Sequence, residues 1–236
     1  LHLLAVSDAV RDDIRRCLPG WPEERIQTLY NRIDIDSVRR EQLPREQARA
    51  ALGLPEGAFV VGNVGRLHED KDQATLIRGF AKALPILAQG SLLVIIGQGK
   101  LESALRALAS DLGIADRVIF KGQVPNARQY FNALDIFALT SDHEPFGMVL
   151  LEAMAAGVPI VASDCGGAPE VLGQSGELFE RGDDIGLASG LVALAELDEG
   201  TGSERKIAAD RRLSVLFSDA AARERFWSLP GLDLDE

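Results

Sequence analysis

Cysteine and histidine are scarce in this sequence, and each scarcity excludes a class of protein. The two cysteines, Cys17 and Cys165, lie far apart, and neither has a second cysteine or histidine at ligand spacing. We therefore expect neither a disulfide framework nor a zinc site. Three histidines in 236 residues do not form a metal cluster by themselves. No uncharged apolar run approaches the roughly 20 residues that a transmembrane helix needs, so no membrane span is expected.

Basic residues are also fewer than acidic residues. The chain has 25 lysines and arginines against 36 aspartates and glutamates, which gives a formal net charge of −11. A nucleic-acid-binding protein usually shows a basic surface, and an anionic membrane surface is a poor partner for an acidic chain. We therefore expect no nucleic-acid partner. Any anionic ligand must be held by local donors that overcome the unfavourable net field.

Apolar residues, in contrast, are plentiful, at 46% of the chain, which suffices for a real core and argues against disorder. From residue 58 onward, helical patterns alternate with short apolar runs at residues 59–64, 92–96, 118–120, 135–139 and 158–162. Runs without polar alternation are typical of strands that are buried on both faces. This alternation predicts an α/β fold with a doubly wound parallel sheet, a Rossmann-like architecture.

The flanking segments give weaker patterns. A short strand over 3–6 precedes a helix that Ser7 is expected to cap, since serine at the N-cap followed by acids is a helix-start signal. Residues 36–53 are polar and helical, with Pro44 near a helix start. Residues 204–228 are expected to form a broken helix, and residues 198–203 a mobile loop.

Two of the predicted strands end in loops that suit a phosphate ligand. Ligands of a doubly wound sheet bind beyond the carboxyl ends of its strands. Gly65 is followed by Arg66 and Lys71, two cations that suit a diphosphate, although a plain solvated loop is the alternative. Gly97 and Gly99 allow a backbone to approach a ligand closely. A bare G-x-G is a weak signal and equally fits an ordinary turn, since the full dinucleotide fingerprint is absent.

A third strand end, residues 141–152, is more informative. Glu144 precedes a proline, so its backbone should be extended, and a helix should begin at the glycine three residues later. The free N–H groups of that first turn would point towards an anion. These groups belong to Gly147, Met148, Val149 and Leu150. Glu152 lies about 7.5 Å further along the helix, roughly the distance from a nucleotide's phosphates to its ribose hydroxyls, which a carboxylate accepts well.

Two other interpretations apply to this pair of glutamates. They could be solvated side chains near a helix start, but Glu152 lies within the otherwise apolar stretch 148–156, where a solvated charge is out of place. They could also be the acid and base of a hydrolase. A backbone anion site between the two carboxylates fits that chemistry poorly.

The 141–152 stretch resembles the E-x7-E motif of retaining glycosyltransferases with the GT-B fold, specifically glycosyltransferase family 4, also called glycosyl transferases group 1. Further matches follow in the family's order over about residues 25–228. They are the turn at 31–34, the G-R-L-x-x-x-K element at 65–71, the G-x-G loop at 97–99, the F-x-G-x-V segment at 120–124, the signature region at 145–162 and the loop at 166–170. Arg32 replaces the usual glycine, and Gln98 replaces an acidic residue, which leaves the donor's identity more open.

The resemblance implies roles for individual residues. Arg66 and Lys71 would be catalytic by neutralising the leaving diphosphate, and Glu144 by facing the donor sugar near the reacting centre. Glu152 would hold the ribose, and the backbone at Val124 would meet the nucleobase. The remaining donor-binding residues are Gly65, Gly97, Gly99, Phe146, Gly147, Met148, Val149 and Leu150. No metal is required if these cations and the helix N-terminus stabilise the leaving group.

The resemblance also implies that this chain is a piece of a longer enzyme, namely the donor-binding half of a GT-B fold. The expected division is 1–18 as the end of a missing N-terminal acceptor domain, 19–57 as linker, 58–203 as the Rossmann-like donor domain and 204–236 as helices returning to the missing domain. We expect the chain to bind donor weakly and to transfer nothing alone.

The implied function is that of a hexosyltransferase. It would move a sugar from a nucleoside-diphosphate sugar, with UDP the expected carrier, to a carbohydrate or glycolipid acceptor with retention of configuration. Bacterial lipopolysaccharide or surface-polysaccharide synthesis is the expected setting. The expected location is the cytoplasm or, through the missing domain, the inner face of the membrane. A non-catalytic nucleotide-sugar-binding module and a transferase of the glycogen-synthase or sucrose-synthase type are the alternatives.

Overall fold

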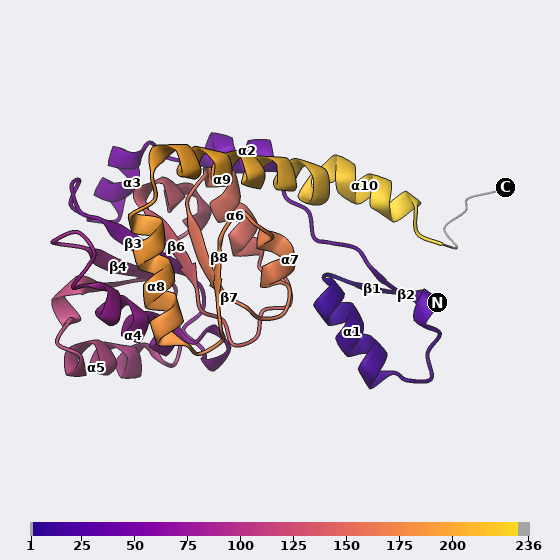
Figure 1. The fold of residues 1–236 in the computed structure, drawn as a ribbon, viewed down its shortest axis with the longest axis horizontal. Coiled ribbons are helices and arrows are strands. Elements are labelled where there is room, and N and C mark those ends of the chain that lie inside the picture. Colours follow the sequence, from indigo (N-terminus) through magenta and orange to yellow (C-terminus); the bar gives the residue numbers. More distant parts are fainter. Residues whose placement is uncertain (1, 231–236) are drawn as a thin grey trace.

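A six-stranded parallel sheet with helices on both faces makes up most of the computed structural model, which describes residues 2–230 (Figure 1). The strand order is β5-β4-β3-β6-β7-β8, and all neighbouring strands are parallel. The strands are β3 (Val60–Val64), β4 (Leu92–Ile96), β5 (Val118–Gly122), β6 (Ile136–Leu139), β7 (Ile160–Ser163) and β8 (Glu177–Phe179). The predicted doubly wound parallel α/β sheet is therefore confirmed.

Helices pack on the two faces of this sheet and create two apolar cores. One core is covered by α4 (Gln73–Ala83), α5 (Glu102–Asp111) and α8 (Asp184–Ala195). The other is covered by α2 (Ile35–Glu41), α3 (Arg45–Ala51), α6 (Met148–Ala156), α7 (Ala168–Leu172) and α9 (Glu199–Arg212). Short 3₁₀ turns at Glu69–Lys71, Ala115–Arg117 and Ala127–Ala133 complete the connections.

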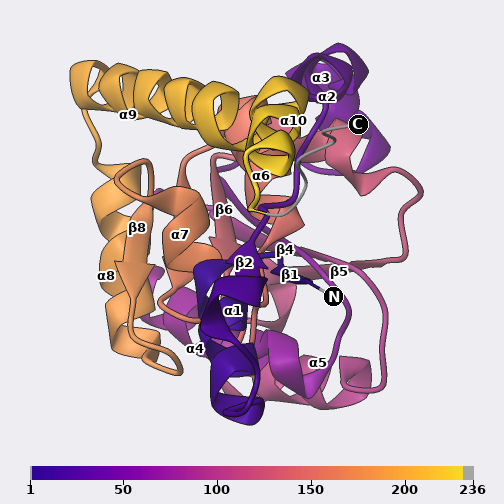
Figure 2. The same ribbon diagram turned by 90° about the vertical axis from the view of Figure 1, so that its right-hand side faces the viewer.

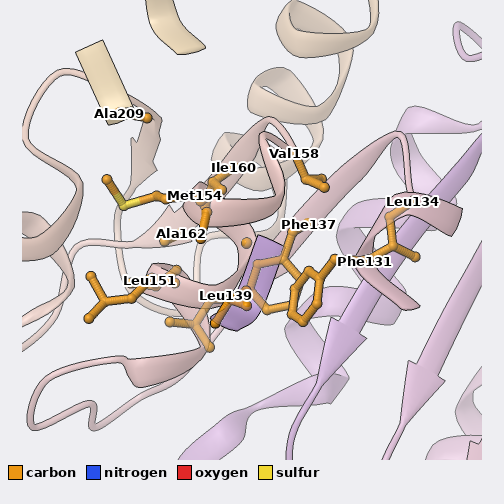
Figure 3. Packing of buried hydrophobic residues seen from close by; sticks show 14 of the residues in the cluster. Phe131, Leu134, Phe137, Leu139, Leu151, Met154, Val158, Ile160, Ala162 and Ala209 are labelled. Carbon is orange, nitrogen blue, oxygen red and sulfur yellow. The ribbon is translucent and has the colours of Figure 1, made fainter. Parts of the chain in front are cut away.

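Each central strand contributes to both cores, which explains why its sequence shows no polar alternation. Successive residues of a strand point to opposite faces of a sheet. In β6, Ile136 faces the core under α4 and α8, whereas Phe137 faces the core under α6. Figure 3 shows Phe137 packed among apolar side chains of the second core, including Phe131, Leu139 and Leu151. We call residues 35–217, which contain this sheet and its helices, the sheet domain.

Residues 2–28 form a small N-terminal unit beside the sheet domain (Figure 1). It contains β1 (Leu3–Ala5), α1 (Asp8–Cys17), a 3₁₀ turn at Glu23–Arg25 and β2 (Ile26–Thr28), and β1 pairs with β2 in parallel. Ser7 caps α1 as predicted, because its side chain accepts a hydrogen bond from the Val10 N–H. No residue of α1 is buried.

The last helix of the described residues is α10 (Asp219–Trp227), which follows α9 after a π-helical turn at Leu213–Phe217. The break predicted within this long helix is therefore confirmed. Figure 2 shows α10 extending past the sheet towards the N-terminal unit. The Arg225 Nε–H donates to the Thr28 carbonyl at 3.0 Å, which connects the two ends of the chain.

The structure differs from the predicted elements in three places. The helical stretch expected over 36–53 is two helices, because Pro44 disfavours helix in the residue before it and starts α3 instead. The prediction of a loop at 198–203 is wrong, because this segment forms the first turn of α9. The Asp198 carboxylate caps that turn by accepting a hydrogen bond from the Thr201 N–H at 3.0 Å. Helix α7 and strand β8 were not predicted, because five and three residues are too few to show a period.

Candidate functional site

The candidate site lies where the strand order of the sheet reverses. From β3 the chain builds outward through β4 to β5 and then crosses back, so that β6 pairs with the other side of β3. Ligands of doubly wound folds bind in the crevice at this switch point, beyond the carboxyl ends of the strands. The three loops singled out from the sequence follow β3, β4 and β6, which are neighbours in the sheet. The structure therefore brings all three together.

The loops after β3 and β4 pack so closely that they require glycine. The Leu67 N–H donates to the Gln98 carbonyl at 3.1 Å. A Cβ atom at Gly97 would lie 1.8 Å from the Gly65 carbonyl oxygen, and one at Gly99 would lie 2.2 Å from the Leu67 oxygen. Because neither gap admits a side chain, these glycines are needed for loop packing before any ligand is considered.

An ion pair links the β3 and β6 sides of the switch point. Lys71 Nζ lies 2.7 Å from the Glu144 Oε2 atom, and the Ser141 hydroxyl donates to the same oxygen at 3.1 Å. Glu144 is only 8% exposed, so its charge needs these donors. The Thr140 hydroxyl donates to the Lys71 carbonyl at 3.0 Å and fixes the lysine's backbone. Neither role was identified from the sequence. The Thr140 contact depends on the pairing of β3 with β6, and the Ser141 contact, although it joins residues only three positions apart, belongs to no motif that marks it.

Arg66, the third predicted catalytic residue, is not part of this ion pair. Its side chain is 74% exposed, and its ion-pair contact within residues 2–230 is Asp70 at 3.5 Å. Burial alone would raise the pKa of Asp70, but the His68 ring, 2.6 Å away, and the neighbouring cations lower it. The Asp142 N–H donates to the Asp70 carbonyl at 2.9 Å, a second link between the β3 and β6 loops.

Helix α6 begins at the site, as predicted. Gly147 is its N-cap, with φ of 98°, a left-handed conformation that favours glycine. The first helical residue, Met148, is 39% exposed, and Val149 is half-buried. The Leu150 N–H was predicted to be free for a ligand. This prediction is wrong, because the group donates to the Gly147 carbonyl at 2.9 Å.

The loop that carries Glu144 is held from behind. A Cβ atom at Gly166 would lie 2.0 Å from the Glu144 carbonyl oxygen, which accepts from the Gly167 N–H at 2.9 Å. The Phe146 side chain is 3% exposed and lies against the rings of Tyr30 and Phe217, at centroid distances of 6.1 and 5.7 Å. Phe146 can therefore offer a ligand its backbone, while its ring fixes the loop.

Glu152 and Val124 lie in half-buried positions. Burial raises the pKa of Glu152; Arg128 opposes this shift, and Glu41 adds to it. Arg128 itself is bound in a bidentate pair by Glu41, with Nε and Nη2 at 2.8 and 2.7 Å from the two carboxylate oxygens. Glu152 is thus a carboxylate held near a cation that another acid already engages. This arrangement was not anticipated, because residues 41, 128 and 152 come from three separate elements.

Other candidate groups contribute little to this arrangement. His143 is exposed. The Cys165 thiol donates to the Ser141 carbonyl at 3.0 Å, and burial raises its pKa. Among residues 2–230, no cluster of three or more His, Cys, Asp or Glu side chains is placed to hold a metal ion. The same described residues contain no helix that is both long and apolar enough to cross a membrane.

The fold and this site define the chain as a Rossmann-like α/β protein with a cluster of polar and charged side chains at its switch point. Comparison with known proteins gives the family: the domain described as glycosyl transferases group 1 matches residues 44–210. The chain therefore belongs to the glycosyl transferases group 1 family.

Two curated relatives show the extent of the similarity. The N-acetyl-alpha-D-glucosaminyl L-malate synthase of Bacillus anthracis is 33% identical over 180 residues, covering 75% of this chain and 46% of the relative. The lipopolysaccharide core biosynthesis glycosyltransferase LpsD of Rhizobium meliloti is 33% identical over 184 residues, covering 77% of this chain and 52% of the relative. The chain thus spans about half the length of these relatives.

A solved structure with the same fold is the Anabaena protein HepE, crystallised in complex with UDP and glucose. It superimposes with a TM-score of 0.82 at 27% identity, covering 95% of this chain and 61% of HepE. A second HepE structure, in complex with UDP-glucose, gives a TM-score of 0.80 at 28% identity and covers 97% of this chain and 64% of that protein.

Proposed function

We propose that this chain is the C-terminal, donor-binding half of a retaining family 4 glycosyltransferase and that its donor is a UDP-sugar. The observation that carries the proposal is the Lys71–Glu144 ion pair across the switch point, next to the N-terminus of α6. UDP and UDP-glucose in HepE, at 27% and 28% identity, support this ligand class.

The chemistry of donor cleavage explains the grouping of charges. Breaking the bond between a sugar and a nucleoside diphosphate builds negative charge on the leaving phosphate, which preorganised donors stabilise. Lys71 would supply a cation, and the exposed Arg66 side chain would exchange its contact with Asp70 for one with the diphosphate. The amides of residues 147–149 at the start of α6 would add backbone donors. These local donors offset the net charge of −11, so that the proposal requires no metal ion.

Glu144 would face the donor sugar. Its carboxylate is held by Lys71 and the Ser141 hydroxyl, both on Oε2. A bound sugar's hydroxyls would donate to this fixed carboxylate, and a diphosphate would compete with it for Lys71. We therefore expect the ion pair to loosen when the donor binds and to reform on release.

Glu152 and Val124 would recognise the nucleoside. The Glu152 carboxylate is half-buried, so a ribose with two vicinal hydroxyls would replace lost water contacts. Val124 follows β5, which lies beyond β4 on the same side of the switch point, and its backbone would meet the base. Gly65, Gly97 and Gly99 would shape the floor of the phosphate site.

The acceptor would bind to the remainder of the enzyme, since this chain spans about half of its relatives. The relative LpsD favours a lipopolysaccharide or surface-polysaccharide acceptor. We propose a cytoplasmic enzyme whose other half reaches a carbohydrate or glycolipid at the inner face of the membrane. The present chain alone should bind donor weakly and show no transfer; robust turnover by it would contradict this division of labour.

Calorimetry of the purified chain with UDP, GDP and ADP, with and without magnesium, tests the proposal. We expect UDP to bind most tightly, independently of magnesium. Lys71→Ala should weaken UDP binding by about tenfold, the loss of one charge-assisted contact, and Glu152→Ala should also weaken it. Lys82→Ala is the matched control, because Lys82 pairs with Asp184 on α8, away from these loops. Equal UDP affinity in wild type, Lys71→Ala and Glu152→Ala would overturn the site assignment.

A further inference from the structure

The N-terminal unit reaches the loop that carries Glu144 through side chains with no role in the site described above. Ser7 is fully buried, and its hydroxyl donates to the Pro145 carbonyl at 2.7 Å. The Glu144 carbonyl, one residue earlier, accepts from the Gly167 N–H on the other side. Two consecutive peptide groups of the site loop are therefore held, one from within the sheet domain and one from the N-terminal unit.

The second connection is an unusual helix cap. The N–H groups of Asp8 and Ala9 each donate to one oxygen of the Glu170 carboxylate, both at 2.7 Å, and the next N–H, that of Val10, donates to the Ser7 hydroxyl. The first three amides of α1 are thus satisfied, two of them by a residue 162 and 161 positions away. A carboxylate at a helix N-terminus also interacts favourably with the helix dipole.

Glu170 is itself fixed within the sheet domain, so this cap fixes the position of α1 relative to that domain. It lies in α7, and Arg212 donates to the carbonyls of Glu170 and Val171, the latter at 2.7 Å from Nε. The Tyr30 ring lies against Phe146, and its hydroxyl donates to the Asp8 Oδ2 atom at 3.4 Å. Burial, Asp8 and Glu170 raise the pKa of Tyr30 to about 12, so that its phenol stays protonated and able to donate.

α1 has no buried residue that could hold it against the sheet domain by apolar packing. Val6, just before the helix, packs against the second core. The hydrogen bonds from Ser7 and the first turn of α1 to the sheet domain converge on residues 145 and 170. A segment attached in this way moves with those residues. If the site loop shifts, Ser7 loses its acceptor, and if α1 moves away, the Pro145 peptide loses one of its anchors.

We propose that Ser7 and Glu170 form a clasp that positions the Glu144–Gly147 loop and couples the N-terminal unit to occupancy of the donor site. The proposal rests on the proposed function for the identity of the ligand. The contacts that form the clasp are independent of that function. Both are positioning residues, since they act through the Pro145 peptide and α1 and not on the donor. Coupling between two sites is reciprocal, so donor binding should tighten the clasp as much as the clasp tightens donor binding.

The test combines amide hydrogen exchange with UDP titration of the full 236-residue chain. Glu170→Ala should speed exchange at residues 8–10 and also at residues 146–148 and should weaken UDP binding by about five- to tenfold, the low end of measured couplings between sites. In wild type, UDP should slow exchange at residues 8–10, and in Glu170→Ala this protection should be lost. Ser7→Ala should produce the same pattern. Glu170→Gln, which keeps one acceptor oxygen, should restore part of it.

Glu180→Gln is the matched control, because Glu180 is an exposed acid of the same domain. If Glu170→Ala speeds exchange only at residues 8–10 and leaves both UDP affinity and residues 146–148 unchanged, the cap is merely structural and the clasp is disproved. Should wild type bind no nucleotide at all, the proposed function fails. The clasp is then judged by residues 146–148 in the ligand-free chain: faster exchange in Glu170→Ala supports it, and unchanged exchange overturns it.

Discussion

The sheet domain and the N-terminal unit are held together by opposite means. In the sheet domain, two continuous apolar cores fix the helices to the sheet, and strand residues such as Phe137 and Val161 are fully buried. In the N-terminal unit, no residue of α1 is fully buried, and the N-terminus of α1 is fixed by hydrogen bonds from Ser7 and Glu170. Apolar burial is strong but non-directional, whereas such hydrogen bonds specify position at a small net free energy. The hydrogen bonds therefore define the position of the N-terminal unit on the sheet domain but contribute little free energy to its attachment.

Matched substitutions in the two regions should break or sharpen this comparison, and the largest difference is expected for glycine. Gly97→Ala places a Cβ atom 1.8 Å from a backbone oxygen at φ of 145°, so it should destabilise the chain by at least about 4 kcal/mol or prevent folding. Gly20→Ala in the N-terminal unit meets nothing within 4 Å and should change stability by less than about 0.5 kcal/mol. Urea denaturation measures both, and a mild effect of Gly97→Ala would show that these loops can separate.

Truncation of apolar side chains should give the next largest difference. Phe137→Ala empties a fully buried position of the core and should cost about 3–4 kcal/mol. Leu4→Ala removes a side chain that is 44% exposed and should cost less than about 0.5 kcal/mol. The denaturation midpoints of the two variants measure this difference. Similar losses of stability from the two changes would contradict the assignment of stability to the sheet domain.

Arginine substitutions should separate the regions by a smaller amount. Arg49 is 1% exposed and donates to the Ala133 carbonyl and to Asp135, so Arg49→Met leaves that carboxylate without one of its partners and should cost about 2–3 kcal/mol. Arg16, paired with Asp13 in α1, has a side chain that is 77% exposed, and Arg16→Met should cost less than about 0.5 kcal/mol. Thermal unfolding of both variants checks this. An equal response would mean that the Arg49 interaction contributes little.

The smallest expected effect depends on pH. Burial raises the pKa of Glu152 above its ordinary value of 4.5, with Arg128 opposing, so the buried carboxyl stabilises the fold when protonated and loses that contribution as pH rises through the raised pKa. Glu152→Gln should therefore match wild type near pH 4 and become more stable relative to it towards pH 8, by less than about 1 kcal/mol. Glu24→Gln removes an exposed acid of the N-terminal unit and controls for net charge. A constant difference from pH 4 to pH 8 would contradict the burial effect.

Much of the sheet domain could be predicted from the sequence because the signal there is local. The run Leu92–Ile96 coincides with β4, and Gly147 is the residue at which α6 begins. Local patterns failed where the signal is short or comes from a distant partner. Residues 198–203, with two glycines, were predicted to be a loop, yet the Asp198 cap and the following residues of α9 make the segment helical. β8 has three residues and is defined by its pairing with β7.

In the candidate site too, some residues could be predicted from the sequence and others could not. Glu144, Lys71 and the strand-end glycines could be selected from the sequence, because parallel strands bring their carboxyl ends to one edge and the residue types suit a phosphate ligand. The partners that hold them could not. Thr140 and the Tyr30–Phe146–Phe217 ring cluster join elements through tertiary contacts that no local pattern predicts.

By itself, the sequence determined the class of fold and the order of most strands and helices along the chain, because the hydrophobic period is a property of neighbouring residues. Residue chemistry likewise selected the residues that we propose to bind an anion. Only the tertiary structure decided which groups meet. The strand order that puts β3 beside β6 lets Lys71 reach Glu144, and the packing of residues 7 and 8 against residues 145 and 170 joins the N-terminal unit to the site. These contacts join residues that are 73 to 162 positions apart in the sequence, and the free energy that selects them is spread over the whole core.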